Sequence, residues 1–277
     1  MTPYPNLISE SLLISETVKL LRSFGGRAAA TSVVDFVMKI RRPDPLLAKK
    51  LVAELIERDP RLQLNGEIVE LIVADFETRE LEDTEFVVFD LETTGAKTPP
   101  CRVTEIGAYR VKNGAVGGEF HTLVNPETPI PHFITNLTGI DDEMVADAPV
   151  FADVAHNFLE FIGDSVLVAH NSGFDMRFLN HEIGRVFPEY RLANPCLCTV
   201  QLSRKLLPEI VNHKLKTVAE HYSIDLYNHH RAAADAHATA HIFINLLTQL
   251  NDSGVTDIAA VRKMSSRKHR YAKRQRA

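Results

Sequence analysis

The chain of 277 residues is 45% hydrophobic and 24% charged, an ordinary composition for a globular protein. It contains no run of about 18 apolar residues, and its start lacks a basic region followed by an apolar stretch, so we expect a cytoplasmic protein with no membrane segment. The three cysteines form no C-x-x-C pair, which argues against a disulfide framework and against a zinc knuckle.

The formal net charge of -5 is unevenly distributed along the chain. From Arg262 to Ala277 there are eight Lys or Arg residues and no acid, and we interpret residues 251–277 as a basic C-terminal tail. Such a tail binds a polyanion in some proteins and is a solvated end in others, and the sequence leaves both interpretations open.

Residues 1–82 are predicted to form a small, mainly helical domain. Three segments with helical apolar spacing precede a hairpin around Asn65-Gly66, the strongest short hairpin signal. Three short helices followed by a hairpin resemble a winged helix. The predicted helices are Glu16–Ser23, Ala28–Lys39 and Pro45–Arg58.

The basic residues of this first domain suggest one role for it. If the domain binds DNA, Arg41, Arg42, Lys49 and Lys50 would meet phosphate. Three acids on and after the same predicted helix oppose that interpretation, and a fold alone does not assign a function. DNA binding and protein docking or dimerisation therefore both remain open.

Residues 83–250 are predicted to form an α/β domain that follows an acidic linker, Glu77–Glu85. Its first strands form an antiparallel meander around Asn113-Gly114, and strands then alternate with helices after the long connection Pro126–Pro149. This order predicts a mixed sheet with helices on both faces. The predicted strands begin near residues 86, 102, 119, 165 and 195, and the predicted helices span 150–162, 173–186, 200–207, 215–221 and 232–250.

Two carboxylates lie at the end of the first of these strands. Asp90 and Glu92 are two residues apart, so both face the same side of the strand. Carboxylates about 4 Å apart repel each other by roughly 4 kcal/mol at an effective dielectric constant near 20. This arrangement predicts a cation between the two acids.

Two further segments carry candidate polar residues. Asp175 falls in the first turn of a predicted helix, where the helix dipole favours an acid. His230 and Asp235 would point about 140° apart on a continuous helix, so we expect His230 to precede the helix and fold back toward Asp235, with His229 as its rival. The pair His237 and His241 lacks a third zinc ligand, so we interpret it as structural.

Together these segments resemble the three exonuclease motifs of the DnaQ-like DEDD superfamily. The matching residues are Phe86-x-x-x-Asp90-x-Glu92-x-Thr-Gly, Asn171-x-x-Phe-Asp175 and His230-x-x-x-x-Asp235. Intervening segments such as Thr104-Glu-Ile-Gly-Ala also resemble the family, and the likeness covers about residues 84–250. Arg231 occupies the position of the tyrosine that defines the tyrosine branch, so the chain resembles the histidine branch. The family often has an acid where this chain has Ala234.

The resemblance implies a ribonuclease H-like fold with a mixed five-stranded sheet, and a two-metal site. Asp90, Glu92, Asp175 and Asp235 would hold two divalent ions, Mg²⁺ or Mn²⁺, because their ligands are all oxygens. His230 would be the general base. The residues expected to bind substrate are Thr93, Thr94, Ile140 and Asn171, with Ile140 also explicable as a core residue.

The activity implied is hydrolysis of single-stranded DNA or frayed ends from the 3′ end, with release of nucleoside 5′-monophosphates. Two alternatives share the same site: a 3′-5′ exoribonuclease, and a proofreading subunit associated with a polymerase. Nucleic acid is the expected partner, DNA before RNA, and a polymerase or repair protein is a further expected partner. No membrane partner is expected.

Overall fold

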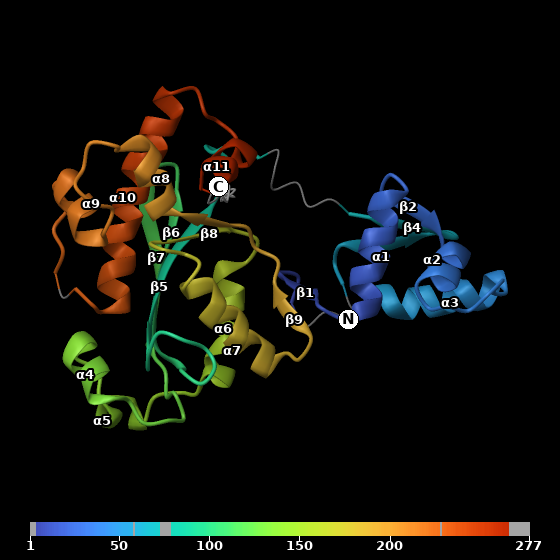
Figure 1. Cartoon of the computed structure of the whole chain (residues 1–277), viewed down its shortest axis with the longest axis horizontal. Coiled ribbons are helices and arrows are strands. Elements are labelled where there is room, and N and C mark those ends of the chain that lie inside the picture. Colours follow the sequence, from blue (N-terminus) through green and yellow to red (C-terminus); the bar gives the residue numbers. More distant parts are fainter. Residues whose placement is uncertain (1–3, 58, 73–78, 228, 266–277) are drawn as a thin grey trace, which may run out of the picture.

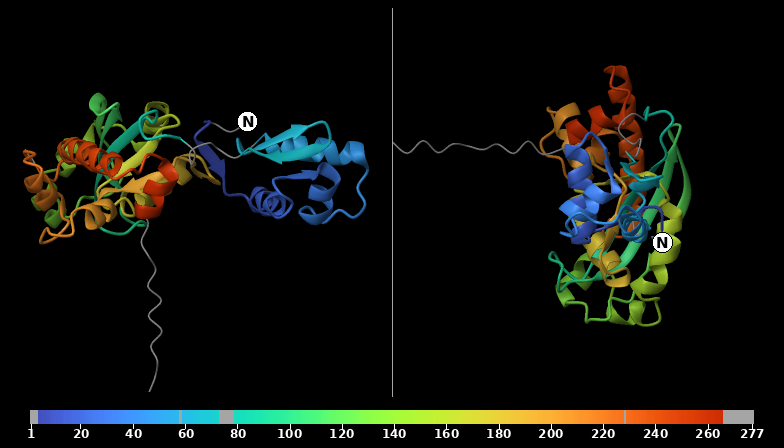
Figure 2. Two further views of the ribbon diagram at one scale, coloured as in Figure 1. Left: turned by 90° about the horizontal axis from the view of Figure 1, so that it is seen from above. Right: turned by 90° about the vertical axis from the view of Figure 1, so that its right-hand side faces the viewer.

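The computed structural model describes residues 4–57, 59–72, 79–227 and 229–265. Figure 1 shows a small N-terminal unit beside a larger α/β unit, and the left view of Figure 2 shows the same two units from above. No helix within the described ranges is long and apolar enough to cross a membrane.

The larger unit is built on a five-stranded mixed sheet with strand order β10-β8-β5-β6-β7. Strands β5 (Phe86–Thr93), β6 (Val103–Lys112) and β7 (Ala115–Leu123) form the predicted antiparallel meander. Strands β8 (Val166–Ala169) and β10 (Cys196–Cys198) run parallel to β5. The predicted ribonuclease H-like sheet is therefore confirmed.

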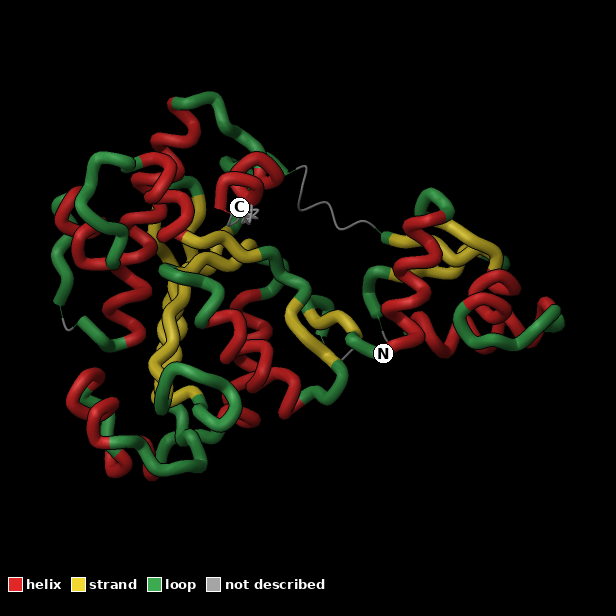
Figure 3. The backbone as a smooth tube through the Cα atoms, in the orientation of Figure 1, coloured by secondary structure: helices red, strands yellow, loops and turns green. Residues whose placement is uncertain are grey.

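Strand β5 is apolar on both faces because helices cover both faces of the sheet. Val87, Phe89 and Leu91 pack in the core beneath α6 (Phe151–Ile162) and α7 (Asp175–Val186). Phe86 and Val88 pack in a second core on the opposite face. The helices of that face, red in Figure 3, are α8 (Thr199–Leu206), α9 (Leu215–His221), α10 (Ala232–Asp252) and α11 (Ile258–Ser265).

The long connection between β7 and α6 contains two short helices. They were not predicted, because the prolines of this segment indicated an irregular connection. Helix α4 (His132–Thr138) begins after Pro131 and ends at Gly139, whose φ of 72° is left-handed and suits glycine. Helix α5 (Asp142–Ala146) begins after Asp141, whose side chain accepts a hydrogen bond from Met144 N–H. Local capping residues therefore define both helices, although neither has a long periodic apolar pattern.

The N-terminal unit contains three helices and a three-stranded sheet with its own core. The helices are α1 (Leu12–Ser23), α2 (Ala30–Phe36) and α3 (Pro45–Ile56). Strands β3 (Leu62–Asn65) and β4 (Ile68–Leu71) form the predicted hairpin around Asn65-Gly66, and β2 (Arg27–Ala29) pairs with β4. Its assignment as an independent domain ending at residue 82 stays a prediction.

Both ends of the described chain contribute to the larger unit. Strand β1 (Leu7–Ser9) pairs with β9 (Tyr190–Leu192), and Leu7 is fully buried in the first core. Helix α11 lies within the segment predicted as a basic tail, yet its Ile258 and Val261 are buried in the second core. Residues 73–78 of the linker region and 266–277 of the tail lie outside the described residues.

Candidate active site

One face of the β5–β6 pair carries a group of carboxylates. Asp90 and Glu92 continue the parity of Phe86 and Val88, so they lie on the α10 face of the sheet. Directly opposite on β6, Glu105 pairs with Glu92 and Gly107 pairs with Asp90. Three acids and a glycine therefore share one patch of this face.

Gly107 lets the start of α10 approach this patch. A Cβ added at Gly107 would lie 2.3 to 2.5 Å from backbone atoms of Ala232 and Ala233. Helix α10 begins at Ala232, which places Asp235 in its first turn. Carboxylate oxygens of Asp90, Glu92 and Asp235 lie within 4.8 Å of one another.

We expect Gly107→Val to separate these acids. The new side chain would displace the start of α10, because backbone atoms cannot give way as a flexible side chain does. Overpacking of this kind costs about 1 to 3 kcal/mol. Urea denaturation would measure that loss, and Gly117→Val on β7, where an added Cβ meets nothing, is the matched control. Equal stability of the two variants would contradict the close approach.

Asp175 joins the cluster from the other side of the sheet. Strand β8 ends at Ala169, and a turn leads to α7, whose first residue is Asp175. The side chain is 2% exposed, and its carboxylate accepts a hydrogen bond from the backbone N–H of Leu91. Asp175 is also the charge that most strongly affects Asp90. Asp175 therefore lies near enough to Asp90 for its charge to act on that carboxylate, and its place as a fourth metal ligand stays a prediction.

Three acids of the cluster have raised pKa values. Burial, followed by the charges of Asp175 and Glu92, raises the pKa of Asp90 well above its usual range. Burial and the neighbouring Asp235 raise the pKa of Glu92 to about 8, and burial raises the pKa of Asp175 to about 7. Burial therefore disfavours the ionised form of all three acids, and neighbouring carboxylates add to this for Asp90 and Glu92.

Glu105 differs from the other acids because it is fully paired. Burial opposes its ionisation, but hydrogen bonds from Arg231, His121 and Ala232 N–H outweigh burial and lower its pKa. Arg231 donates from Nε at 3.1 Å and from Nη2 at 2.8 Å, and Ala232 N–H donates at 2.8 Å. Glu105 thus fixes the segment between the histidines and Asp235, a role that its place in an alternating strand did not reveal.

The two adjacent histidines lie before α10, as expected. His229 Nδ1 lies 2.8 and 2.9 Å from the two carboxylate oxygens of Asp235. His230 has a left-handed φ of 70° and donates its backbone N–H to Asp235 at 3.3 Å. The two rings stack with centroids 3.9 Å apart, and ring nitrogens of both lie within 4.8 Å of an Asp235 oxygen. Both histidines therefore reach the cluster.

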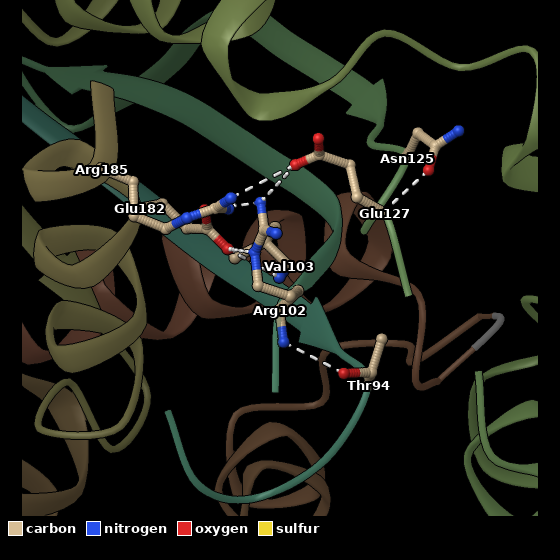
Figure 4. A network of polar contacts seen from close by, with 7 residues as sticks. All are labelled: Thr94, Arg102, Val103, Asn125, Glu127, Glu182 and Arg185. Carbon is tan, nitrogen blue, oxygen red and sulfur yellow. Dashed lines mark hydrogen bonds and ion pairs between the residues drawn. The ribbon is translucent and has the colours of Figure 1, made fainter. Parts of the chain in front are cut away.

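A polar network holds the turn that contains Thr93 and Thr94 (Figure 4). Thr94 Oγ1 accepts from Arg102 N–H at 3.0 Å, and Arg102 binds both oxygens of the buried Glu182. Arg102 Nη2 also lies 3.0 Å from Glu127 Oε2 and forms an ion pair with it. The hydroxyls of Thr93 and Thr94 are used within the turn, and Thr94 N–H donates to the Arg102 carbonyl oxygen at 2.8 Å. The expected contact of this backbone with a substrate stays a prediction.

The structure gives Ile140 a role in packing. Its side chain has no exposed surface and lies in a small core with Ile130, Ile134 and Val145. The expected contact between Ile140 and a base is therefore replaced by core packing beneath α4 and α5. Local sequence could not separate these two roles, because both require an apolar side chain.

Asn171 lies at the edge of a cavity next to the cluster. Its φ of 76° is left-handed, a conformation that asparagine adopts more readily than most residues. The cavity has a volume of about 500 Å³, and Ser172, Gly173 and Arg177 also line it. Asn171 is thus exposed at this cavity, in the turn that leads to Asp175.

His170 is a partly buried residue that sequence reasoning missed. Its ring contacts Thr199 Oγ1 at 2.9 Å and the His213 carbonyl oxygen at 3.1 Å. Burial lowers the pKa of His170 to about 4, so the ring is neutral at pH 7. It links the end of β8 to α8 and to the loop before α9, and thereby fixes the turn that leads to Asn171.

The donor set fits divalent cations that prefer oxygen ligands. Carboxylate oxygens of Asp90, Glu92 and Asp235 lie within 4.8 Å of one another, and burial, followed by the charges of neighbouring acids, raises the pKa of Asp90 and of Glu92. A cation would offset both effects. Carboxylate oxygens are the ligands that Mg²⁺ and Mn²⁺ prefer. The expectation of two such ions is consistent with this geometry.

Comparison with known proteins identifies the central part of the chain. The family model RNase_T, described as "Exonuclease", matches residues 87–243. The chain is 45% identical over 177 residues to the PolC-type DNA polymerase III of Caldanaerobacter subterraneus subsp. tengcongensis, covering 64% of this chain and 12% of that polymerase. It is 43% identical over 193 residues to a putative bifunctional exonuclease/endonuclease protein of Mycobacterium tuberculosis, covering 66% of this chain and 29% of that protein.

Solved structures share the fold of the larger unit. Exonuclease X in complex with 5′ overhanging duplex DNA is 27% identical, with a TM-score of 0.52 over 65% of this chain and 99% of that chain. Escherichia coli exonuclease I in complex with a dT13 oligonucleotide is 17% identical, with a TM-score of 0.54 over 62% of this chain and 43% of that chain. The second likeness is one of fold.

Proposed function

Because the chain belongs to the RNase_T family of exonucleases, we propose that it is a metal-dependent exonuclease that removes nucleotides from the 3′ end of single-stranded DNA. The observation that carries the proposal is that carboxylate oxygens of Asp90, Glu92 and Asp235 lie within 4.8 Å of one another. Asp175 is the charge that acts most strongly on Asp90, and Arg231 already neutralises a fifth acid, Glu105. A structural cluster would need no such excess of charge. DNA is favoured as substrate because exonuclease X, which resembles this chain, was solved with DNA.

In this proposal Asp90, Glu92, Asp175 and Asp235 would hold two divalent ions. Ions bound there would supply Lewis-acid stabilisation of the charge that develops during phosphodiester hydrolysis. Leu91 N–H orients the Asp175 carboxylate, and Glu105 holds the start of α10 so that Asp235 faces β5. Protein groups thereby fix the ligands before the substrate arrives.

His230 is proposed as the general base that takes a proton from water. Burial and the neighbouring His229 lower the pKa of His230, so the ring is more often neutral at pH 7. The backbone of Thr93 and Thr94, together with Asn171, would hold the terminal nucleotide. His229 contacts Asp235 directly and is proposed to orient that carboxylate.

Two histidine variants separate these roles. We expect His230→Ala to lower kcat by roughly 10² to 10⁴-fold and to flatten the dependence of rate on pH near neutrality, which is the usual contribution of a general base. His229→Ala should weaken metal binding more than it changes the pH profile. The measurement is the pH dependence of hydrolysis for both variants, and an unchanged profile in His230→Ala would assign the base to another group.

End-labelled oligonucleotides test the proposed activity. With Mg²⁺ or Mn²⁺, the full chain should release mononucleotide at once from 3′-labelled single-stranded DNA and should produce a ladder of shortened products from 5′-labelled DNA. The reverse pattern would contradict the direction, and no hydrolysis at all would contradict the function. Matched RNA oligonucleotides distinguish a deoxyribonuclease from a ribonuclease, because only RNA presents the 2′-hydroxyl.

Proofreading beside a polymerase is a second candidate function. The observation that favours it is the similarity to PolC-type DNA polymerase III, although the chain spans about an eighth of those proteins. Proofreading predicts faster removal of a mismatched than of a matched 3′ nucleotide from a primer, and faster still with a polymerase present. Equal rates on the two primers would argue for general degradation.

A further inference from the structure

A cleft lined by arginines lies between the N-terminal unit and the edge of the sheet. Its volume is about 750 Å³, and we call it the arginine cleft. Arg22 and Arg61 line it from the N-terminal unit, and Arg191 and Arg262 line it from the larger unit. No acid occurs among the described residues that line it. Figure 1 shows β9 and α11 on the side of the larger unit that faces α1.

The four arginines contribute unequally to the charge of the cleft. Arg61 binds the buried Asp59 at 2.7 Å and the Ser9 carbonyl, so its role is mainly structural. Arg191 meets Glu10 at 3.3 Å, but both side chains are about half exposed and such pairs are weak. Arg22, in the last turn of α1, is exposed. The cleft therefore keeps positive charge from Arg22 and Arg191.

The walls of the cleft are joined at its base. Strand β1 pairs with β9, and Glu10 N–H donates to the Glu189 carbonyl at 2.6 Å. Asp59, from the N-terminal unit, accepts from Ser9 N–H at 2.9 Å. The N-terminal unit is thus tied to the strand that carries Arg191, so Arg22 and Arg191 belong to one surface.

The arginine cleft continues toward the active site along β10 and α11. Cys196 and Arg262 line the cleft, while Cys198 and Ser265, on the same faces of these two elements, line the cavity beside Asn171. The Cys196 thiol also contacts the Ser172 side chain of that cavity. Two steps along β10, from Cys196 to Cys198, span about 7 Å. A strand a few nucleotides long would reach from one to the other.

We propose that the arginine cleft binds the sugar-phosphate backbone of the substrate strand on the 5′ side of the nucleotides held in the active site. This inference rests on the proposed function, because the 3′ end must lie at the carboxylates for the 5′ portion to enter the cleft. Guanidinium groups bind phosphate with two parallel hydrogen bonds and without regard to sequence. The N-terminal unit then serves substrate binding through α1 and not through the basic residues around α3.

The test measures binding of 5′-fluorescein dT20 to the full chain by anisotropy, in chelator so that no hydrolysis occurs. Each phosphate contact on a single strand contributes a salt slope of about 0.7, which corresponds to about fivefold in affinity at about 0.1 M salt. Arg22→Ala/Arg191→Ala should therefore weaken binding about 25-fold and reduce the slope by about 1.4. Arg22→Lys/Arg191→Lys, which keeps the charge, should restore most of the affinity.

Hydrolysis of the dinucleotide dT2 separates this inference from the proposed function. dT2 has a single nucleotide on the 5′ side of the scissile bond and is too short to enter the cleft, so its kcat/KM should be the same in wild type and in Arg22→Ala/Arg191→Ala. If wild type hydrolyses neither dT2 nor dT20, the proposed function fails. If it hydrolyses both but the alanine variant binds dT20 as wild type does, the cleft proposal alone fails.

Two further double variants remove equal charge elsewhere. Lys112→Ala/Lys216→Ala alters exposed residues on β6 and α9 and should leave the affinity for dT20 within about twofold. Arg41→Ala/Lys49→Ala tests the surface of α3. An equal loss in all three alanine variants would mean a general effect of net charge, and a loss confined to the α3 variant would move the site there; either outcome overturns the proposal.

Discussion

Asp175→Asn is expected to lower the rate of DNA hydrolysis by roughly 10³-fold while leaving the fold intact. Metal ions that stabilise charge in the transition state contribute several kcal/mol, and each 1.4 kcal/mol corresponds to a factor of ten in rate. Asparagine keeps the shape of the side chain and its hydrogen bond from Leu91 N–H, so the loss should appear in kcat. Steady-state hydrolysis of 3′-labelled single-stranded DNA measures it.

The control for this variant is Asp153→Asn. Asp153 lies in the first turn of α6 as Asp175 does in α7, but it is exposed and distant from the carboxylate cluster. Any general effect of removing an acid from the first turn of a helix would appear in both variants. Hydrolysis by Asp175→Asn at the rate of Asp153→Asn would remove Asp175 from the site.

Glu105→Ala is expected to cost about 3 kcal/mol of folding free energy, because it leaves Arg231 and Ala232 N–H without their buried acceptor. The start of α10 should also lose its position, so activity should fall together with stability. Urea denaturation monitored by circular dichroism measures the first effect. Glu119→Ala, an exposed carboxylate bound to Tyr109, should change stability by less than about 0.5 kcal/mol.

A double-mutant cycle shows whether the effect belongs to the pair. If Glu105 acts mainly on Arg231, the variant Glu105→Ala/Arg231→Ala should be less destabilised than the sum of the two single variants. Additive losses would mean that the two side chains act independently. The ion pair would then be incidental to the position of Asp235.

Local signals in the sequence predicted much of the structure. The parity of Asp90 and Glu92 followed from strand geometry, and the hairpin at Asn65-Gly66 followed from turn chemistry. Asp175 could be placed in the first turn of a helix for the same kind of reason. Such features depend on residues close together in the chain, so a single sequence contains them.

Features that depend on distant partners were not predictable. Strand β1 is three residues long and exists because Leu7 pairs with Leu192. Helix α11 was not predicted, because the basic residues around it indicated a solvated tail. Ile258 and Val261 form its buried face. The sequence places Glu105 in a strand but does not predict its partner, because Arg231 comes close to it only in the folded chain. Sequence spacing could not choose between His229 and His230, because the left-handed φ of His230 decides their directions.

The most direct test of the central claim is the number of Mn²⁺ ions that the full chain binds, measured by isothermal titration calorimetry near pH 7.5. The account predicts two ions per chain, and it predicts weaker binding in Asp90→Asn, because Asp90 lies among all the other acids of the cluster. Binding of no ion, or binding that Asp90→Asn leaves unchanged, would contradict the account.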